Sequence, residues 1–147
     1  MKWVGQMQNR PIYQTNRDLE NEKKVKAIVE PKWRCELKKL PFAYHVDWMA
    51  LRGNTPLAFI EIKWRENLPI NKYPEYMLSL NKWMKGKEYT KETNIPFILI
   101  VHFAEGDYYL KQDNIEVRYG FGGRYDRGDA QDVEPMVFIP IGTFVKL

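Results

Sequence analysis

The sequence predicts an α/β domain in which a mixed central sheet is flanked by helices, with extra strands at the C-terminal end. Three observations predict it: a helical pattern at 15–29, two strand-like runs joined by a tight turn at 52–56, and a nearly continuous apolar run at 95–103. An uninterrupted apolar strand is typical of the buried interior of a sheet. The expected order is helix, three strands, helix, strand and then further strands.

All 147 residues are expected to form a single domain (1–147), because a chain of this length can bury one sizeable core. A hydrophobic content of 44% with 14% aromatic residues excludes wholesale disorder. No stretch approaches the roughly 18 apolar residues of a membrane span, and the first residues lack the apolar core of a signal peptide, so we expect a cytoplasmic protein with no membrane contact. The net charge of +4 permits a nucleic-acid partner without demanding one. The single cysteine, Cys35, is expected to be a small buried filler.

The first element is a helix that Thr15 or Asn16 caps and that is expected to end before Pro31. Helical spacing places Glu22 on the apolar face and turns Glu20 away from it. The apolar members of that face are Val25, Ile28 and Val29. Glu22 is therefore either an acid that reaches toward the sheet or an ordinary flanking acid of a charged first turn.

Three strands follow, at 33–40, 44–51 and 57–64, and the Gly, Asn and Pro residues of 52–56 favour an antiparallel hairpin between the last two. Asp47, Glu61 and Lys63 interrupt these apolar runs, and strand alternation puts Glu61 and Lys63 on one face with Phe59. Unpaired buried charge is costly, so these groups should pair, meet solvent or hold a cation. The ordinary alternative is a surface hairpin with a Glu–Lys pair contributing ~0.2–1 kcal/mol.

A second helix is expected from Pro74 to about Gly86, with one polar side carrying Ser79, Lys82 and Lys85. Its buried stripe would consist of Tyr76, Met77, Leu80, Trp83 and Met84. After the apolar strand, further strands are expected at 108–119 and 136–145. Between them, the glycine-rich segment 120–129 is either a mobile connection or, with Arg118, Arg124 and Arg127, a loop that touches a phosphate backbone. His45 and His102 are expected to pack in the sheet.

An Asp, a strand-to-strand gap of thirteen residues, a Glu-x-Lys triplet and an upstream helix carrying a glutamate together resemble the PD-(D/E)XK nuclease superfamily. The matching residues are Asp47, Glu61, Lys63 and Glu22, and the resemblance covers about 15–103. Val46 stands where the motif name has proline, the least constrained position. The resemblance implies an αβββαβ restriction-endonuclease-like core.

The resemblance also implies the chemistry of a metal-dependent nuclease, small and of the phage or Holliday-junction-resolvase type. Asp47, Glu61, the backbone carbonyl of Ile62 and Glu22 would hold Mg²⁺ or Mn²⁺, and Lys63 would orient the attacking water. The substrate would be DNA, with RNA not excluded, and cleavage would be structure-selective or relaxed in sequence. The expected nucleic-acid contacts are Lys82, Lys85, Arg124 and Arg127.

A homodimer would fit such a small nuclease, as would a host-cytoplasm location if the gene is phage-encoded. Two other functions stay open from the residues alone. One is a non-catalytic nucleic-acid-binding module that keeps the nuclease fold. The other is a scaffold protein whose Asp–Glu–Lys network binds no metal.

Overall fold

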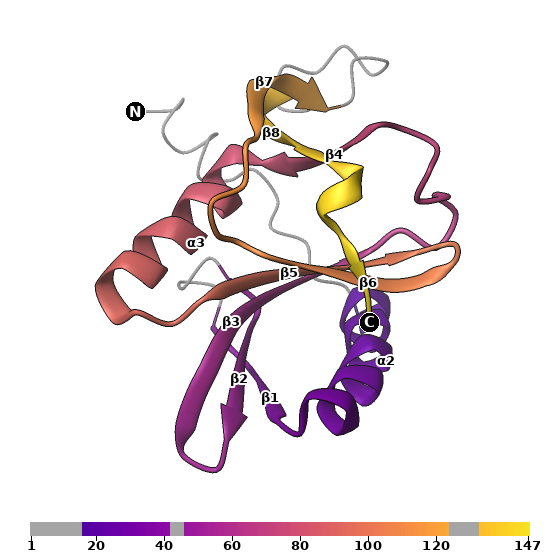
Figure 1. Cartoon of the computed structure of the whole chain (residues 1–147). Helices are drawn as coiled ribbons and strands as arrows, with labels where there is room; N and C mark the ends of the chain where they lie inside the picture. The colour runs from indigo at the N-terminus through magenta and orange to yellow at the C-terminus, as the bar shows by residue number, and fades with distance from the viewer. Residues whose placement is uncertain (1–15, 42–45, 124–132) are drawn as a thin grey trace, which may run out of the picture.

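The computed structural model describes residues 16–41, 46–123 and 133–147, which form two sheets and the helices that cover them (Figure 1). In chain order the elements are α2 (Asn16–Trp33), β1 (Glu36–Lys39), β2 (Trp48–Arg52), β3 (Thr55–Trp64), β4 (Glu75–Ser79), α3 (Leu80–Thr93), β5 (Phe97–Phe103), β6 (Gly106–Lys111), β7 (Arg118–Gly123), β8 (Val133–Pro140), a 3₁₀ turn η3 (Ile141–Thr143) and β9 (Val145–Lys146). No helix in this part of the chain is long and apolar enough to cross a membrane.

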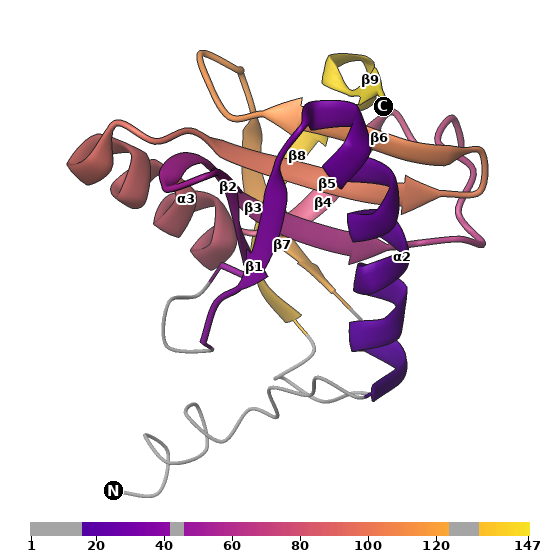
Figure 2. The same ribbon diagram turned by 90° about the horizontal axis from the view of Figure 1, so that it is seen from below.

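The central sheet has the order β1-β2-β3-β5-β6-β9. Its β3 and β5 run parallel and the other neighbouring pairs are antiparallel, so the predicted mixed sheet is confirmed. Helix α2 covers one face, where Val25 and Val29 pack on Ile60, Ile62 and Ile100. Helix α3 and a second sheet, β4-β8-β7, cover the opposite face (Figures 1 and 2).

The hairpin and the apolar strand are as expected. β2 and β3 pair antiparallel around Gly53, whose φ of 60° suits a tight turn. The seven residues of β5 lie in the middle of the sheet, and five of them are buried. The first two strands are shorter than predicted: Trp33 belongs to α2, β2 starts only at Trp48, and residues 44 and 45 lie outside the described part of the chain, with His45 among them.

The predicted end of the first helix is wrong, because α2 continues through Pro31 to Trp33. Arg34 then adopts a left-handed conformation (φ 50°), and the Cys35 N–H donates to the Glu30 carbonyl at 3.1 Å, as in a Schellman cap. The Arg52 guanidinium caps the last carbonyls, donating to those of Trp33 and Arg34, each at 3.0 Å. These contacts offset the hydrogen bond that proline cannot make.

Two side chains near this helix are less buried than expected. Ile28 is 45% exposed, since the stripe formed by Glu22, Val25 and Val29 turns it to the side of the helix. Cys35 is half-buried, and burial raises the pKa of its thiol.

The second predicted helix is correct only in its central part. Residues 75–79 form strand β4, in which Tyr76 and Leu78 are buried and Met77 is exposed, and the helix begins at Leu80. Met84 is also exposed rather than buried. Pairing of β4 with β8 outweighs the local helical pattern.

Gly86 does not end this helix, which continues to Thr93 and stops at a left-handed Asn94. The glycine lies where α3 approaches β5, and a Cβ at this position would come within 2.6 Å of the Phe97 ring. Gly86 therefore serves close helix–sheet packing.

The C-terminal strands differ from the prediction in extent. The predicted strand 108–119 is two strands, because β6 stays in the central sheet whereas β7 joins the second one. The predicted strand 136–145 is interrupted by η3, which separates β8 from β9. Residues 120–123 of the glycine-rich segment belong to β7, while Arg124 and Arg127 lie outside the described residues.

Candidate active site

The hairpin brings Asp47 beside Glu61. Trp48, the first residue of β2, lies opposite Ile60, so the antiparallel register continued by one residue places Asp47 opposite Glu61. Asp47 precedes β2 and is partly buried, whereas Glu61 is only 1% exposed. Two carboxylates from adjacent segments thus lie together on the face of the sheet that α3 covers.

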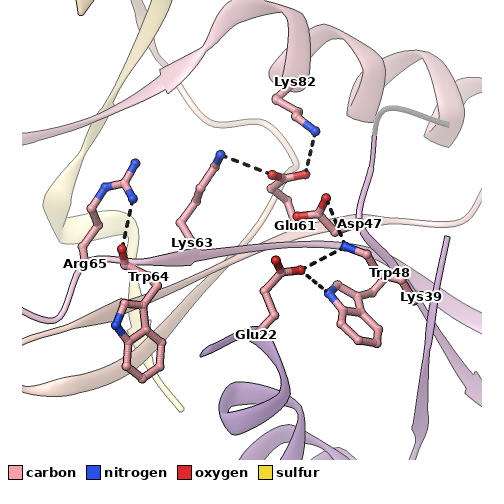
Figure 3. A network of polar contacts seen from close by, with 9 residues as sticks. All are labelled: Glu22, Lys39, Asp47, Trp48, Glu61, Lys63, Trp64, Arg65 and Lys82. Atoms are coloured by element: carbon pink, nitrogen blue, oxygen red, sulfur yellow. Dashed lines mark hydrogen bonds and ion pairs between the residues drawn. The ribbon is translucent and has the colours of Figure 1, made fainter. Parts of the chain in front are cut away.

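Glu61 is held between two lysines (Figure 3). Lys63 Nζ lies 3.4 Å from Glu61 Oε2, and Lys82 Nζ, from the first turn of α3, lies 3.3 Å from Glu61 Oε1. Despite this ion pair, Oε1 accepts no hydrogen bond from any described residue. The predicted shared face of Glu61 and Lys63 is confirmed, and Lys82 is a third member of the same cluster.

Burial raises the pKa of the Glu61 carboxyl to about 7. The charge of Asp47 and a hydrogen bond with it also raise this pKa, whereas Lys63 and Lys82 act in the opposite direction. Two ammonium groups therefore do not fully offset the cost of burying this carboxylate. A stronger positive charge next to Asp47 and Glu61 would favour the ionised form.

Glu22 approaches the site from α2, on the other face of the sheet (Figure 3). The predicted helix phase is confirmed, because Glu22 is buried and Glu20 is exposed. Glu22 Oε1 accepts hydrogen bonds from Trp48 Nε1 at 2.8 Å and from Lys39 Nζ at 3.1 Å. Lys39 Nζ also lies 3.7 Å from Asp47 Oδ1, so an ammonium group links Glu22 to Asp47.

The backbone of Ile62 faces the edge on which Asp47 lies. The N–H groups of Phe59 and Arg65 donate to carbonyls of the β5 segment, so odd-numbered residues of β3 direct their backbone groups toward β5. Even-numbered residues, including Ile62, direct theirs to the opposite side, where β2 begins only at Trp48. The Ile62 carbonyl is therefore directed to the side of β3 on which Asp47 lies.

Other predicted contacts lie elsewhere. Lys85 pairs with the exposed Glu88 on α3, at 3.3 Å, and not with the acids. Arg118 is held by Glu75 at 2.9 Å and lies over the Phe138 ring. His102 packs in the sheet as expected.

Lys39 is the functional candidate that sequence reasoning missed. Its contact with Glu22 and Asp47 depends on the pairing of Lys39 with Trp48 across β1 and β2. Strand alternation within one segment carries no information about that register.

The donor set fits a hard divalent cation. Glu61 Oε1 is a buried carboxylate oxygen that accepts no hydrogen bond from the described residues, and it lies beside a second carboxylate. Oxygen donors of this type are those that Mg²⁺ and Mn²⁺ prefer. The described residues contain no cluster of three or more acidic, His or Cys ligands, and Lys39 lies between Glu22 and Asp47.

Comparisons with known proteins agree with this architecture. No curated protein sequence matches the chain. A solved structure, that of Hjc, a Holliday junction resolvase from the archaeal hyperthermophile Archaeoglobus fulgidus, is similar with a TM-score of 0.56 at 13% identity, over 85% of this chain and 89% of that one. At that identity the similarity shows the shared restriction-endonuclease-like fold. The family described as "Phage putative PDDEXK endonuclease" matches residues 8–147, and the chain therefore belongs to this family of PD-(D/E)XK nucleases.

Proposed function

We propose that this protein is an endonuclease that hydrolyses phosphodiester bonds in DNA with the help of Mg²⁺ or Mn²⁺. The observation that carries the proposal is the buried Glu61 carboxylate, which lies beside Asp47 with one oxygen that accepts no hydrogen bond from the described residues and with Lys63 3.4 Å away. Membership of the nuclease family supports it. A divalent cation at this position would neutralise charge on the scissile phosphate and lower the pKa of the attacking water.

The residues of the chain then have separate tasks. Asp47, Glu61 and the Ile62 carbonyl would hold the cation, since the two carboxylates lie side by side and the carbonyl is directed to the side of β3 on which Asp47 lies. Lys63, with its side chain 29% exposed, would orient the attacking water and stabilise the negative charge that develops on the phosphate. Glu22, expected as a further ligand, would contribute its charge at the edge of the site through Lys39.

Contacts to DNA would come from basic residues around these acids. Lys82 reaches Glu61 from α3 and is 26% exposed, so it can turn to a phosphate once a cation binds Glu61. Lys85 lies one turn further along the same helix. Arg124 and Arg127 are proposed to contact the phosphate backbone, without a role in catalysis.

Cleavage is proposed to be structure-selective or relaxed in sequence. The DNA contacts proposed above go to phosphates, and such contacts fix the position of the DNA without reading its sequence. A homodimer that offers two such sites to one DNA molecule would suit branched substrates.

The deciding experiment incubates the protein with supercoiled plasmid, branched DNA and RNA in Mn²⁺, Mg²⁺ or EDTA. We expect cleavage of DNA with either metal and none in EDTA. Glu61→Gln should abolish cleavage, and Glu88→Gln, which changes an exposed acid on α3, should leave it unchanged. Full cleavage in EDTA would refute the proposal. Tight DNA binding without cleavage in either metal would identify a non-catalytic binding module instead.

A further inference from the structure

Lys39 lies between two acids of the candidate active site. Its ammonium is 3.1 Å from Glu22 Oε1 and 3.7 Å from Asp47 Oδ1 (Figure 3). It also lies over the Trp48 ring, 5.1 Å from the ring centroid. Two carboxylates and the face of an aromatic ring all attract a positive charge, so this position strongly favours a cation.

The position of Lys39 is set by the sheet. Lys39 pairs with Trp48 across β1 and β2, and the next residue, Leu40, donates its N–H to the Asp47 carbonyl at 2.8 Å. The backbone next to Lys39 is therefore hydrogen-bonded to that of the acid. The side chain of Lys39 starts close to the carboxylate that its ammonium meets.

Glu22 is arranged to hold this lysine. Its Oε1 accepts one hydrogen bond from Lys39 and a second from Trp48 Nε1, at 2.8 Å. An oxygen that already accepts two hydrogen bonds is a poor additional ligand for a metal ion, which would have to displace at least one donor.

The charges of the whole site lead to the same conclusion. Three carboxylates (Glu22, Asp47 and Glu61) face three ammonium groups (Lys39, Lys63 and Lys82), so the formal charges cancel when Glu61 is ionised. One divalent ion at Asp47 and Glu61 makes the site positive. A second would add two more positive charges within a few ångströms, unless Lys39 left.

We propose that the Lys39 ammonium is a built-in cation that takes the place of a second divalent ion between Glu22 and Asp47. The protein then binds one divalent ion, at Asp47 and Glu61, and Glu22 is a positioning residue for Lys39 and not a metal ligand. The inference rests on the proposed function, because it takes a divalent ion at Asp47 and Glu61 as its starting point.

The test counts bound Mn²⁺ on the full chain by isothermal titration calorimetry and by electron paramagnetic resonance of free Mn²⁺. Wild type should bind one equivalent. Lys39→Met keeps an apolar stem over Trp48 but removes the charge. This variant should bind a second equivalent of Mn²⁺, with an affinity about tenfold or more higher than that of any second Mn²⁺ ion bound by wild type. Adding Glu22→Gln to Lys39→Met should remove that second equivalent.

Two further variants control for charge and for position. Lys39→Arg keeps the positive charge and should stay at one equivalent. Lys38→Met changes the neighbouring lysine, which is exposed and pairs with Glu36 at 2.9 Å, and should behave as wild type. Circular dichroism of each variant reports whether it is folded.

The inference would be overturned if wild type bound two equivalents of Mn²⁺, or if folded Lys39→Met bound only one equivalent with wild-type affinity. If Lys39→Met does not fold, the number of Mn²⁺ ions bound by wild type decides by itself. If wild type binds one ion and cleaves DNA while Lys39→Met gains no second ion, the inference fails but the proposed function stands. Wild type that binds no Mn²⁺ and cleaves no DNA overturns both.

Discussion

The buried carboxyl of Glu61 should make the stability of the metal-free protein depend on pH. Its pKa is raised from the ordinary value of 4.5 to about 7, chiefly by burial. Between these values the folded protein keeps a proton that the unfolded chain releases, so the free energy of unfolding falls as pH rises. The penalty is absent below about pH 4.5 and complete above about pH 7.

The size of the penalty follows from the shift. The difference between about 7 and 4.5 is about 2.5 pKa units, and each unit is worth about 1.4 kcal/mol, so ionised Glu61 costs the metal-free fold about 3 kcal/mol. A glutamine cannot ionise and avoids this cost. Glu61→Gln should therefore match wild type near pH 4 and exceed its free energy of unfolding by up to about 3 kcal/mol at pH 8.

The assay is urea unfolding followed by tryptophan fluorescence, in EDTA, at pH values from about 4 to 8. Glu88→Gln is the matched control, since it removes an exposed acid of α3 and should show no such pH dependence relative to wild type. With Mn²⁺ at pH 8 the order should reverse, because the ion stabilises wild type and has lost a ligand in Glu61→Gln. A difference that is flat with pH, or a Glu61→Gln protein less stable than wild type at pH 8 in EDTA, would refute the reasoning.

Three further predictions concern single positions. Lys63→Ala should lower the single-turnover cleavage rate ~10²–10⁴-fold, while the Mn²⁺ affinity measured by calorimetry stays near that of wild type. If the variant cleaves at the wild-type rate, Lys63 is only an ion-pair partner of Glu61. Glu22→Gln should reduce cleavage more than the exposed Glu20→Gln, and the opposite order would reverse the assignment of the helix acid. Gly86→Ala should lower the free energy of unfolding by ~1–3 kcal/mol, because the new Cβ would lie 2.6 Å from an aromatic ring of β5. Gly142→Ala is the control, since a Cβ there would have nothing within 4 Å, and equal stability of the two variants would contradict the packing argument.

The central part of the site could be predicted because its signals are local. Two charges two residues apart in an apolar strand must share a face, and the short loop between β2 and β3 requires antiparallel pairing, so Asp47 and Glu61 had to come close. The phase of Glu22 followed equally from helical spacing. The apolar β5 was recognisable because a strand in the middle of a sheet is apolar on both faces.

The errors arose where distant segments decide local structure. Residues 75–79 look like the first turn of a helix, but pairing with β8, about sixty residues later, makes them a strand. Gly86 resembles a helix-ending glycine until the approach of α3 to Phe97 is known. Lys39 gained its importance only from its partner across β1 and β2, a contact that requires the register of the sheet.

The second sheet connects the C-terminal third of the chain to the candidate site. Strand β4 leads without a break into α3, whose first turn carries Lys82, and β4 is hydrogen-bonded to β8 (133–140). The direction of the lysine that meets Glu61 is thus anchored by a strand that lies outside the αβββαβ core. The core alone would keep Asp47, Glu61 and Lys63 but would lose the support that directs Lys82 to them, so a change in β8 can act on the candidate site without touching any of its residues.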